Sequence, residues 1–181
     1  SKKNSAYHPY AISKQCSDML CHSYALTYNM NISILLSSNV YGGGQLSWER
    51  IIPGTIRSLN NKETPVIRSS GNLSRNYIYV SDLVSALLFV AKFNIVKNKA
   101  EVYNLKDRDI LKTSDLVKMI GKLYNNISVN MEIINNSIDE KEALETSRVN
   151  EIDSMGWAPQ YNISEGIKLT LEWYKNYFDK V

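Results

Sequence analysis

The feature that most constrains how this chain can fold is a helical pattern that leads directly into a short apolar run. From residue 9 to about residue 28, one face of the predicted helix is apolar or small: Ile12, Cys16, Met19, Leu20, Ser23 and Leu26. Residues 32–36 then read Ile-Ser-Ile-Leu-Leu, which is typical of a parallel strand buried on both faces. A helix followed at once by such a strand is half of a βαβ unit, so the sequence predicts an α/β fold.

The rest of the chain continues to alternate helices with short strands. Further helices are predicted at residues 48–59, 81–93, from 113 or 114, at 147–155 and after 162. Short strands are predicted at residues 66–68 and 76–80, around a turn at 69–72, and at 102–105 and 128–134. Pro53 and Gly54 are expected to interrupt the first of these helices near its start. Ser81 is the expected N-cap of the next, with Asp82 in its first turn, where a carboxylate is favoured.

Three consecutive glycines follow the predicted strand at residues 32–36. Residues 37–44 read Ser-Ser-Asn-Val-Tyr-Gly-Gly-Gly and predict a tight loop just past the carboxyl end of that strand. Ligands of open α/β sheets bind at this edge. The run does not match the Gly-x-Gly-x-x-Gly dinucleotide fingerprint, and a flexible surface turn without a ligand is the alternative interpretation.

Charge and cysteine content limit the kind of partner. The net charge of +3 comes from lysines and arginines scattered along the chain, so no nucleic-acid partner is indicated, and an anionic partner should be a small phosphate-bearing ligand. Cys16, Cys21 and two histidines lack the spacing of a zinc site or a disulfide framework, so reduced thiols in a cytoplasm are expected. No apolar run is long enough to cross a membrane, so no membrane partner is expected.

One spacing near the start of the chain could carry chemistry. Tyr10 and Lys14 are four residues apart in the predicted helix, so they lie one turn apart on the same face. A nearby ammonium group favours the phenolate form of a tyrosine and lowers its pKa from about 10. A tyrosine packed on a helix face beside a solvated lysine would show the same spacing, so the pair gains meaning only from the rest of the chain.

Several segments together resemble the extended short-chain dehydrogenase/reductase family, the NAD-dependent sugar-nucleotide epimerases and dehydratases. Residues 10–14 match its Tyr-x-x-x-Lys motif, residues 39–44 its Asn-x-Tyr-Gly loop, and residues 75–82 its Arg-Asp-Phe-x-x-Val-x-Asp block. Residues 155–159 match its C-terminal signature. The similarity runs in order from about residue 7 to about residue 177. The glycine run and residues 48–57 look closest to the CDP-glucose 4,6-dehydratase subfamily.

The resemblance implies a fold and a division of the chain. The implied fold is the C-terminal part of a Rossmann-like doubly wound sheet plus a smaller α/β substrate-binding lobe. Residues 1–41 and about 81–106 would supply the last Rossmann-like elements, and residues 42–80 and 107–181 the substrate-binding lobe. The family's N-terminal dinucleotide-binding half, with its glycine-rich loop, has no counterpart in this sequence. We therefore expect a C-terminal fragment that is inactive by itself.

The same resemblance implies roles for particular residues. Tyr10 would exchange a proton with the sugar 4-hydroxyl, while Lys14 would hold the nicotinamide ribose of NAD, with NADP as an alternative. Asn39 and Val40 would also contact the cofactor. The substrate, a nucleotide-diphosphate sugar, would be held by Asn39 and by four further residues: Ile52, Arg68, Arg75 and Arg148. Arg75 would clamp the diphosphate, because a guanidinium fork suits paired phosphate oxygens. No metal site is expected.

Other residues of these motifs are interpreted as structural, or depart from the family pattern. Tyr41 and Trp157 are interpreted as packing residues, and Asp82 as a helix N-terminal residue rather than a catalytic acid. Asn76 stands where the family usually has aspartate, and Leu36 where it often has arginine. These departures weaken the expectation for the diphosphate and nucleotide contacts but leave Tyr10 and Lys14 unaffected.

The sequence leaves three functions open. The leading hypothesis is an NAD(P)-dependent sugar-nucleotide 4,6-dehydratase, and the alternatives are a 4-epimerase of the same family or a non-catalytic module that binds sugar nucleotides. The resemblance also implies a homodimer of the full-length protein, formed through the helix that bears the tyrosine and the helix before it. Without that preceding helix, an apolar outer face would be left exposed.

Overall fold

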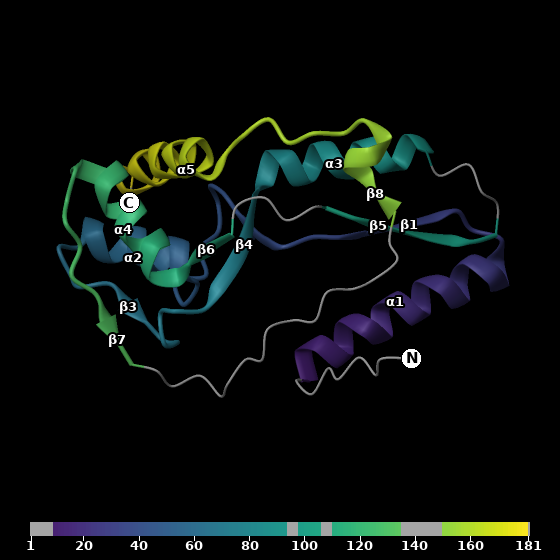
Figure 1. Ribbon diagram of the computed structural model, residues 1–181, viewed down its shortest axis with the longest axis horizontal. Coiled ribbons are helices and arrows are strands. Elements are labelled where there is room, and N and C mark those ends of the chain that lie inside the picture. The colour runs from purple at the N-terminus through teal and green to yellow at the C-terminus, as the bar shows by residue number, and fades with distance from the viewer. Residues whose placement is uncertain (1–8, 94–97, 106–109, 135–149, 181) are drawn as a thin grey trace. The chain divides into compact units, whose positions relative to one another are not determined.

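The protein is represented by a computed structural model that describes residues 9–93, 98–105, 110–134 and 150–180 of the 181-residue chain (Figure 1). The chain folds into two compact units, each built from three separate segments of the sequence. Unit 1 comprises residues 1–36, 85–106 and 141–158. Unit 2 comprises residues 37–84, 107–140 and 159–181.

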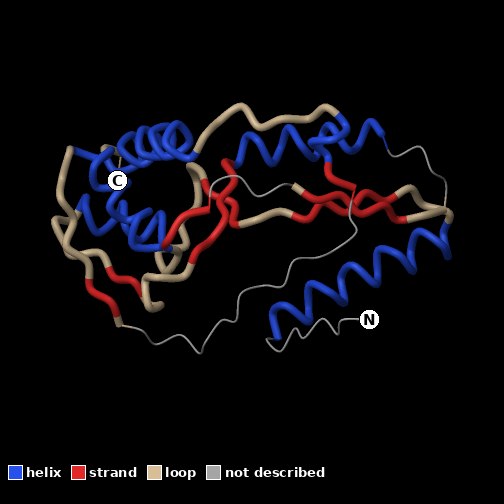
Figure 2. Tube along the Cα trace, in the orientation of Figure 1, coloured by secondary structure: helices blue, strands red, loops and turns tan. Residues whose placement is uncertain are grey.

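Unit 1 contains a short parallel sheet with a helix packed on it. The strands are β1 (Ile32–Leu36), β5 (Ala100–Asn104) and β8 (Asn150–Glu151), and Figure 2 draws strands in red. They pair in the order β1-β5-β8. Helix α1 (Pro9–Tyr28) precedes β1. A small core joins the helix to the sheet through Ala25, Ile34 and Ala100. The predicted helix and strand at the start of the chain are therefore confirmed, as is the α/β class.

Two further elements differ from the predicted boundaries. Helix α3 (Val80–Phe93) begins one residue before Ser81, so this serine lies inside the first turn and is not the N-cap. In place of the helix predicted at residues 147–155 there is only a single 3₁₀ turn, η1 (Ile152–Met155), directly after β8. Residues 147–149 lie outside the described part of the chain.

Unit 2 contains two small sheets. In the first, β2 (Asn39–Tyr41) pairs in parallel with β4 (Ser74–Tyr79), which pairs antiparallel with β6 (Ile110–Lys112). In the second, β3 (Val66–Ile67) pairs in parallel with β7 (Glu132–Ile133). The strands predicted at residues 66–68 and 76–80 therefore belong to different sheets. The loop predicted at residues 37–44 is also wrong in part, because residues 39–41 pair as a strand.

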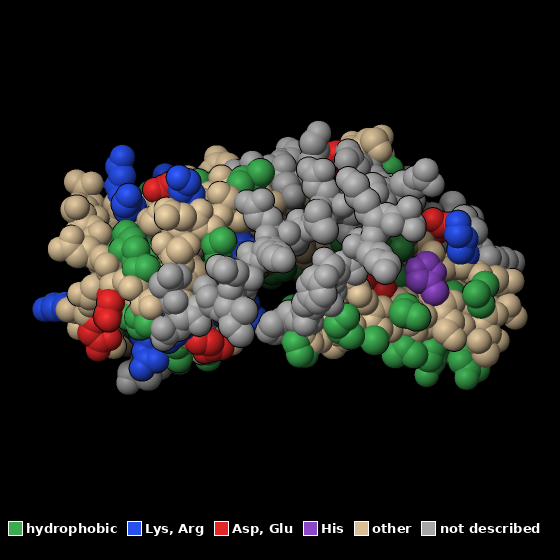
Figure 3. All heavy atoms as spheres, turned by 60° about the horizontal axis from the view of Figure 1, so that its bottom comes forward, with side chains coloured by type: hydrophobic (Ala, Val, Ile, Leu, Met, Phe, Trp, Pro, Cys, Tyr) green, Lys and Arg blue, Asp and Glu red, His purple; other side chains and the backbone are tan. Residues whose placement is uncertain are grey.

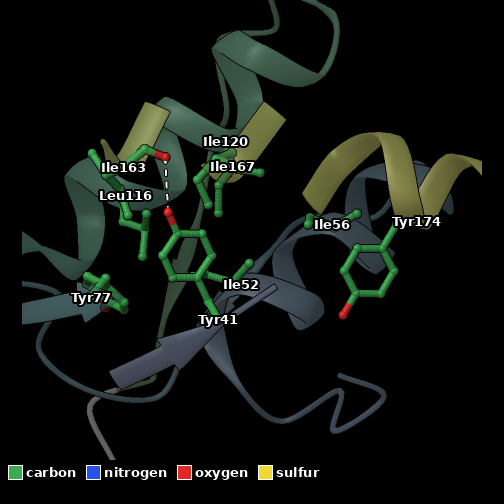
Figure 4. Packing of buried hydrophobic residues seen from close by; sticks show 9 residues of the cluster. All are labelled: Tyr41, Ile52, Ile56, Tyr77, Leu116, Ile120, Ile163, Ile167 and Tyr174. Carbon is green, nitrogen blue, oxygen red and sulfur yellow. Dashed lines mark hydrogen bonds between the residues drawn. The ribbon is translucent and has the colours of Figure 1, made fainter. Parts of the chain in front are cut away.

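Three helices enclose the core of unit 2: α2 (Ile51–Asn60), α4 (Thr113–Asn125) and α5 (Ile163–Phe178). The core is formed by nine buried side chains (Figure 4): Tyr41, Ile52, Ile56, Tyr77, Leu116, Ile120, Ile163, Ile167 and Tyr174. The helices predicted from residue 113 or 114 and after residue 162 are thus confirmed. Pro53 does not interrupt α2, because it is the third helical residue, where an intrahelical N–H donor is not needed.

Candidate functional site

The predicted catalytic pair lies on α1 of unit 1. The Nζ atom of Lys14 is 5.8 Å from the centroid of the Tyr10 ring, so the ammonium group stands over the aromatic face. The local helix geometry is reinforced by Ser13, whose hydroxyl donates to the Tyr10 carbonyl oxygen at 2.7 Å. Tyr10 is 62% exposed and Lys14 is also exposed. The structure therefore brings these two side chains together on an accessible surface.

Asn39, the residue predicted to contact both cofactor and substrate, opens strand β2 of unit 2. Its side-chain Nδ2 donates to the backbone carbonyl oxygen of Asn76 at 3.3 Å, which ties the exposed amide to the neighbouring strand. Val40 is half-buried and pairs with Ile78 in the same ladder. The amide oxygen of Asn39 is the acceptor of this side chain, and its amide nitrogen is already engaged within the protein.

Arg75 lies on β4, one residue before Asn76, and is half-buried. Its positive charge is close enough to Tyr77 to act on the buried phenol. Burial raises the pKa of Tyr77, while the Arg75 charge and a hydrogen bond with Thr113 oppose that rise. A half-buried guanidinium group is screened less by solvent than a fully exposed one. Such a group can bind a phosphate anion through paired N–H donors.

Asn76 joins this cluster, although the sequence singled it out only as a departure from the family pattern. Its Oδ1 atom is buried and, among the described residues, has no hydrogen-bond partner. Its backbone carbonyl oxygen accepts from Asn39. A buried acceptor without a partner is costly for a protein and is often satisfied by a water or a ligand donor. The position next to Arg75 was the only sequence signal for it.

The remaining predicted substrate residues differ in how accessible they are. Ile52 is 3% exposed and belongs to the core of unit 2, so its side chain is occupied in packing and only its backbone is left for a ligand. Arg68 is exposed, and its Nη1 donates to the Glu49 carbonyl oxygen at 3.2 Å. Arg148 lies outside the described residues. The sequence did not distinguish Ile52 from a surface residue, because its neighbours are equally apolar.

Two residues interpreted as packing groups are confirmed in that role. Tyr41 is 3% exposed, and its hydroxyl donates to the Ile163 carbonyl oxygen at 3.4 Å (Figure 4). Trp157 is buried in unit 1, and its Nε1 donates to the Ser85 hydroxyl oxygen at 3.1 Å.

Asp82 lies in the first turn of α3, as expected, but its carboxylate has a further structural role that the sequence did not predict. It is 2% exposed and accepts from the backbone N–H groups of Gln160 at 2.8 Å and Tyr161 at 3.2 Å. A buried carboxylate with two backbone donors is well satisfied. The segment before α5 is thereby attached to the start of α3.

Within the part of the chain that the structure describes, no group of three or more histidine, cysteine or acidic residues could hold a metal ion. No described helix is both long enough and apolar enough to cross a membrane.

Comparison of the sequence with known families gives a match over residues 3–105, to the family described as "NAD dependent epimerase/dehydratase family". A human relative, dTDP-D-glucose 4,6-dehydratase, is 32% identical over 176 residues. The match covers 94% of this chain and 49% of the human protein. The chain thus spans about half the length of the curated relatives it matches.

Solved structures share the fold of the chain. The dTDP-glucose 4,6-dehydratase of Bacillus anthracis, solved in complex with NAD, aligns with a TM-score of 0.75 at 22% identity, over 93% of this chain and 52% of that protein. The UDP-glucose 4-epimerase of Thermotoga maritima, solved with UDP-glucose, aligns with a TM-score of 0.74 at 24% identity, over 94% of this chain and 54% of the epimerase. The chain therefore has the Rossmann-like α/β fold of these proteins over about half of their length.

Proposed function

The chain belongs to the NAD dependent epimerase/dehydratase family, and from that membership we propose that its protein is a sugar-nucleotide 4,6-dehydratase. In such a reaction, oxidation at C4 makes the C5 proton acidic, water is eliminated across C5 and C6, and reduction at C6 gives a 4-keto-6-deoxy sugar. The human relative named as a dTDP-D-glucose 4,6-dehydratase supports this choice. The observation that carries the proposal is the placement of Lys14 over Tyr10 on an exposed face of α1.

Tyr10 would exchange the proton of the sugar 4-hydroxyl. Proton transfer by a positioned side chain is the usual task of such a group in general acid–base catalysis. The Lys14 ammonium group lies 5.8 Å from the centroid of the Tyr10 ring, and in the proposal its N–H donors hold a ribose hydroxyl beside the phenol.

The residues present fit an NAD cofactor at this position. Tyr10 and Lys14 present their hydroxyl and ammonium groups on one accessible helix face, as a ribose-binding pair requires. Asn39, in unit 2, is expected from the family resemblance alone to contact the cofactor as well, and its amide oxygen is an acceptor. When bound, NAD supplies the hydride chemistry of the reaction. The solved dehydratase of Bacillus anthracis is itself a complex with NAD.

Arg75 would hold the diphosphate of the nucleotide sugar. It is half-buried on β4, beside the buried acceptor of Asn76 and the Asn39 amide. A guanidinium fork pairs with two phosphate oxygens, and a neighbouring amide could accept from a sugar hydroxyl. The candidate nucleotides are those of the thymidine and uridine classes, for which relatives are named, and the cytidine class, which the glycine run resembles.

A 4-epimerase is the second candidate, because the Thermotoga maritima protein with the same fold is named as one. The two reactions share the oxidation at C4 and differ in the steps after it. Incubation of the full-length protein with NAD and either dTDP-glucose or UDP-glucose, with the products observed by proton NMR, separates them. Loss of the C6 hydroxymethyl signals indicates the dehydratase, and inversion at C4 with C6 retained indicates the epimerase.

The role of Tyr10 is tested in the full-length protein by Tyr10→Phe, which removes only the hydroxyl. The variant should lose about a hundredfold to ten-thousandfold in rate, the usual range for a general acid–base group, with its thermal stability unchanged. The matched control is Tyr24→Phe on the same helix, which should keep the wild-type rate. Full activity of Tyr10→Phe would contradict the assigned role.

The ligand class is tested separately by binding of UDP and dTDP, measured by calorimetry. Arg75→Ala should weaken binding strongly, because it removes the paired donors to the diphosphate. Lys118→Ala, which removes an exposed positive charge from α4, is the charge-matched control and should bind like the wild type. Equal losses in the two variants would indicate general electrostatic attraction rather than a diphosphate site.

We propose that the full-length protein works in the cytoplasm. We also propose that it forms a homodimer through α1. The support is that α1 leaves several large apolar side chains exposed, among them Met19, Leu20 and Leu26, and apolar side chains are visible on the surface in Figure 3. Light scattering should show a lower mass for Leu20→Lys than for the wild type. Leu88→Lys, at an equally exposed site on α3, is the control.

A further inference from the structure

Helix α5 is in close contact with residues 41–45, the segment that follows Asn39 and Val40. Three of the five residues in this segment make the contacts. The Tyr41 hydroxyl donates to the Ile163 carbonyl oxygen at 3.4 Å, at the first residue of the helix. The Tyr174 hydroxyl donates to the Gln45 carbonyl oxygen. Between these two bonds, Gly43 lies against the indole of Trp173. The segment that contains the glycine run thus contacts this helix at both of its ends and at Gly43.

Two glycines make this contact possible. A Cβ atom on Gly43 would overlap the Trp173 side chain, and a Cβ atom on Gly166 would overlap the Tyr41 hydroxyl. Both positions therefore need glycine because of close approach. The phenol of Tyr41 is enclosed by α5 and by core side chains from α4 (Figure 4). A ring held in this way has little freedom to move, and the strand that bears it shares that restriction.

The segment before α5 is attached in turn to the end of β4. The Asp82 carboxylate, three residues past the last residue of that strand, accepts from the backbone N–H groups of Gln160 and Tyr161. The ring of Tyr161 also packs edge-to-face on Tyr79, with centroids 5.1 Å apart. Asn162 then caps α5 in a reciprocal capping box with Glu165. The start of α5 is therefore fixed on both sides.

These contacts converge on the two strands that carry the candidate ligand groups. Asn39 is two residues before Tyr41 on β2, and Arg75 lies on β4, which ends three residues before Asp82. A binding group must be held to within a fraction of an ångström and a few tens of degrees to act well. Each strand is thus followed by a contact to α5 or to the segment before it: Tyr41 lies two residues after Asn39, and Asp82 lies seven residues after Arg75.

We propose that Tyr41 and Asp82 are positioning residues, which act through β2 and β4 to hold Asn39 and Arg75 in their ligand-binding positions. The residues themselves are buried and would not touch the ligand. The class of ligand, a nucleoside diphosphate, rests on the proposed function. The positioning of Asn39 does not, because its amide hydrogen bond to Asn76 is present without any ligand.

The first experiment monitors the Asn39 side-chain amide by NMR, with its signal assigned from its loss in Asn39→Ala. Tyr41→Phe removes the hydroxyl and keeps the ring, and Asp82→Asn keeps the shape of the side chain. Gly166→Ala displaces the phenol and removes no functional group. Each variant should shift or broaden the Asn39 amide signal. Ile67→Val, a core substitution on β3, is the control that lowers stability without touching residues 41–45.

The second experiment measures the affinity for UDP by calorimetry. Tyr41→Phe and Asp82→Asn should weaken binding about tenfold to a hundredfold, because a small misplacement of binding groups is costly. Ile67→Val should bind like the wild type. An Asn39 amide that stays unmoved in all three variants, or an affinity loss no larger than in Ile67→Val, overturns the positioning role. Failure of the wild type to bind UDP or dTDP would count against the proposed function, and the amide signal would still decide the inference.

Discussion

The two longest helices of the chain differ in what they do with their surface. α1 has 20 residues, of which the structure buries one, Ala25. α5 has 16 residues and buries five of them: Ile163, Gly166, Ile167, Thr170 and Tyr174. The residues that could carry chemistry are on the helix that contributes little to a core. The helix that contributes most to a core serves to hold other segments in place.

The tyrosines of the two units illustrate the same difference. Tyr10 is mostly exposed, with a lysine over its ring, so its hydroxyl is accessible to a ligand. Tyr41 and Tyr174 are buried, and each donates its hydroxyl to a backbone carbonyl oxygen. A tyrosine near a motif is therefore a candidate for chemistry only where its hydroxyl is accessible, and Tyr41 itself is a packing residue.

The largest expected effect comes from truncating the buried face of α5. Ile167→Ala should lower the free energy of unfolding by about 2–5 kcal/mol, because it leaves a cavity in a closely packed core. Gln15→Ala, at an exposed position of α1, should change it by no more than about 0.5 kcal/mol. Urea unfolding of both variants measures the contrast. Similar losses would show that α1 is as firmly packed as α5.

A smaller loss is expected where α5 meets the glycine run. Gly43→Ala should cost about 1–3 kcal/mol, because the added methyl group would overlap the Trp173 indole. The cost should fall when the same change is made together with Trp173→Leu, which makes room for the methyl group. If the two substitutions are additive in thermal unfolding, the close contact is not the cause of the loss.

The cap of α5 should matter less than its packing. Asn162→Ala should lower the free energy of unfolding by about 1 kcal/mol, because the N–H of Glu165 loses its acceptor. Asn176→Ala, on an exposed position in the same helix, is the control and should have little effect. Chemical unfolding measures the free energy of unfolding of both variants. Equal values would show that the capping box does not stabilise the protein.

The smallest effect should appear only in alkaline solution. Burial raises the pKa of Tyr174 to about 12, against an unfolded value of about 10. The unfolded chain then loses this proton first as the pH rises, so the free energy of unfolding should fall between about pH 10 and pH 12. Tyr174→Phe should flatten part of that fall. Ile167→Val should lower the whole curve without changing its alkaline slope.

Local sequence patterns were sufficient to predict most helices. The spacing of Leu116, Val117 and Ile120 predicts the buried face of α4, and those residues are fully buried. The Asn162 start of α5 carries its own cap, so its beginning could be predicted as well. These features depend on residues three or four apart, which can be compared directly along the sequence.

Strand partners could not be predicted, because they depend on residues far apart in the chain. β3 pairs with β7, more than sixty residues later, and the three-residue strand β6 carries too short a pattern to recognise. The bonds of Asp82 have the same origin, since Gln160 lies 78 residues away. Local reasoning placed Asp82 correctly in a first turn and missed what its carboxylate binds.

The candidate site was predictable to a similar extent. The spacing of Tyr10 and Lys14 predicted that they share a helix face, and the structure places them so. Asn76 was not predicted as a site residue, because its buried oxygen becomes visible only when β4 is paired on both sides. The burial of Ile52 was missed for a related reason, since an apolar residue beside a proline could lie on either side of a helix.

The hydrogen bonds between α5 and residues 41–45 join residues 122 and 129 positions apart in the sequence. During synthesis, the segment that contains Tyr41 therefore leaves the ribosome long before its partners exist. The isoleucine and tyrosine side chains of this part of the core stay without their final neighbours until α5 has been made. Helix α5, with its 16 residues, completes the core of unit 2. A nascent chain arrested before residue 163 should accordingly be cleaved by proteases and bound by chaperones.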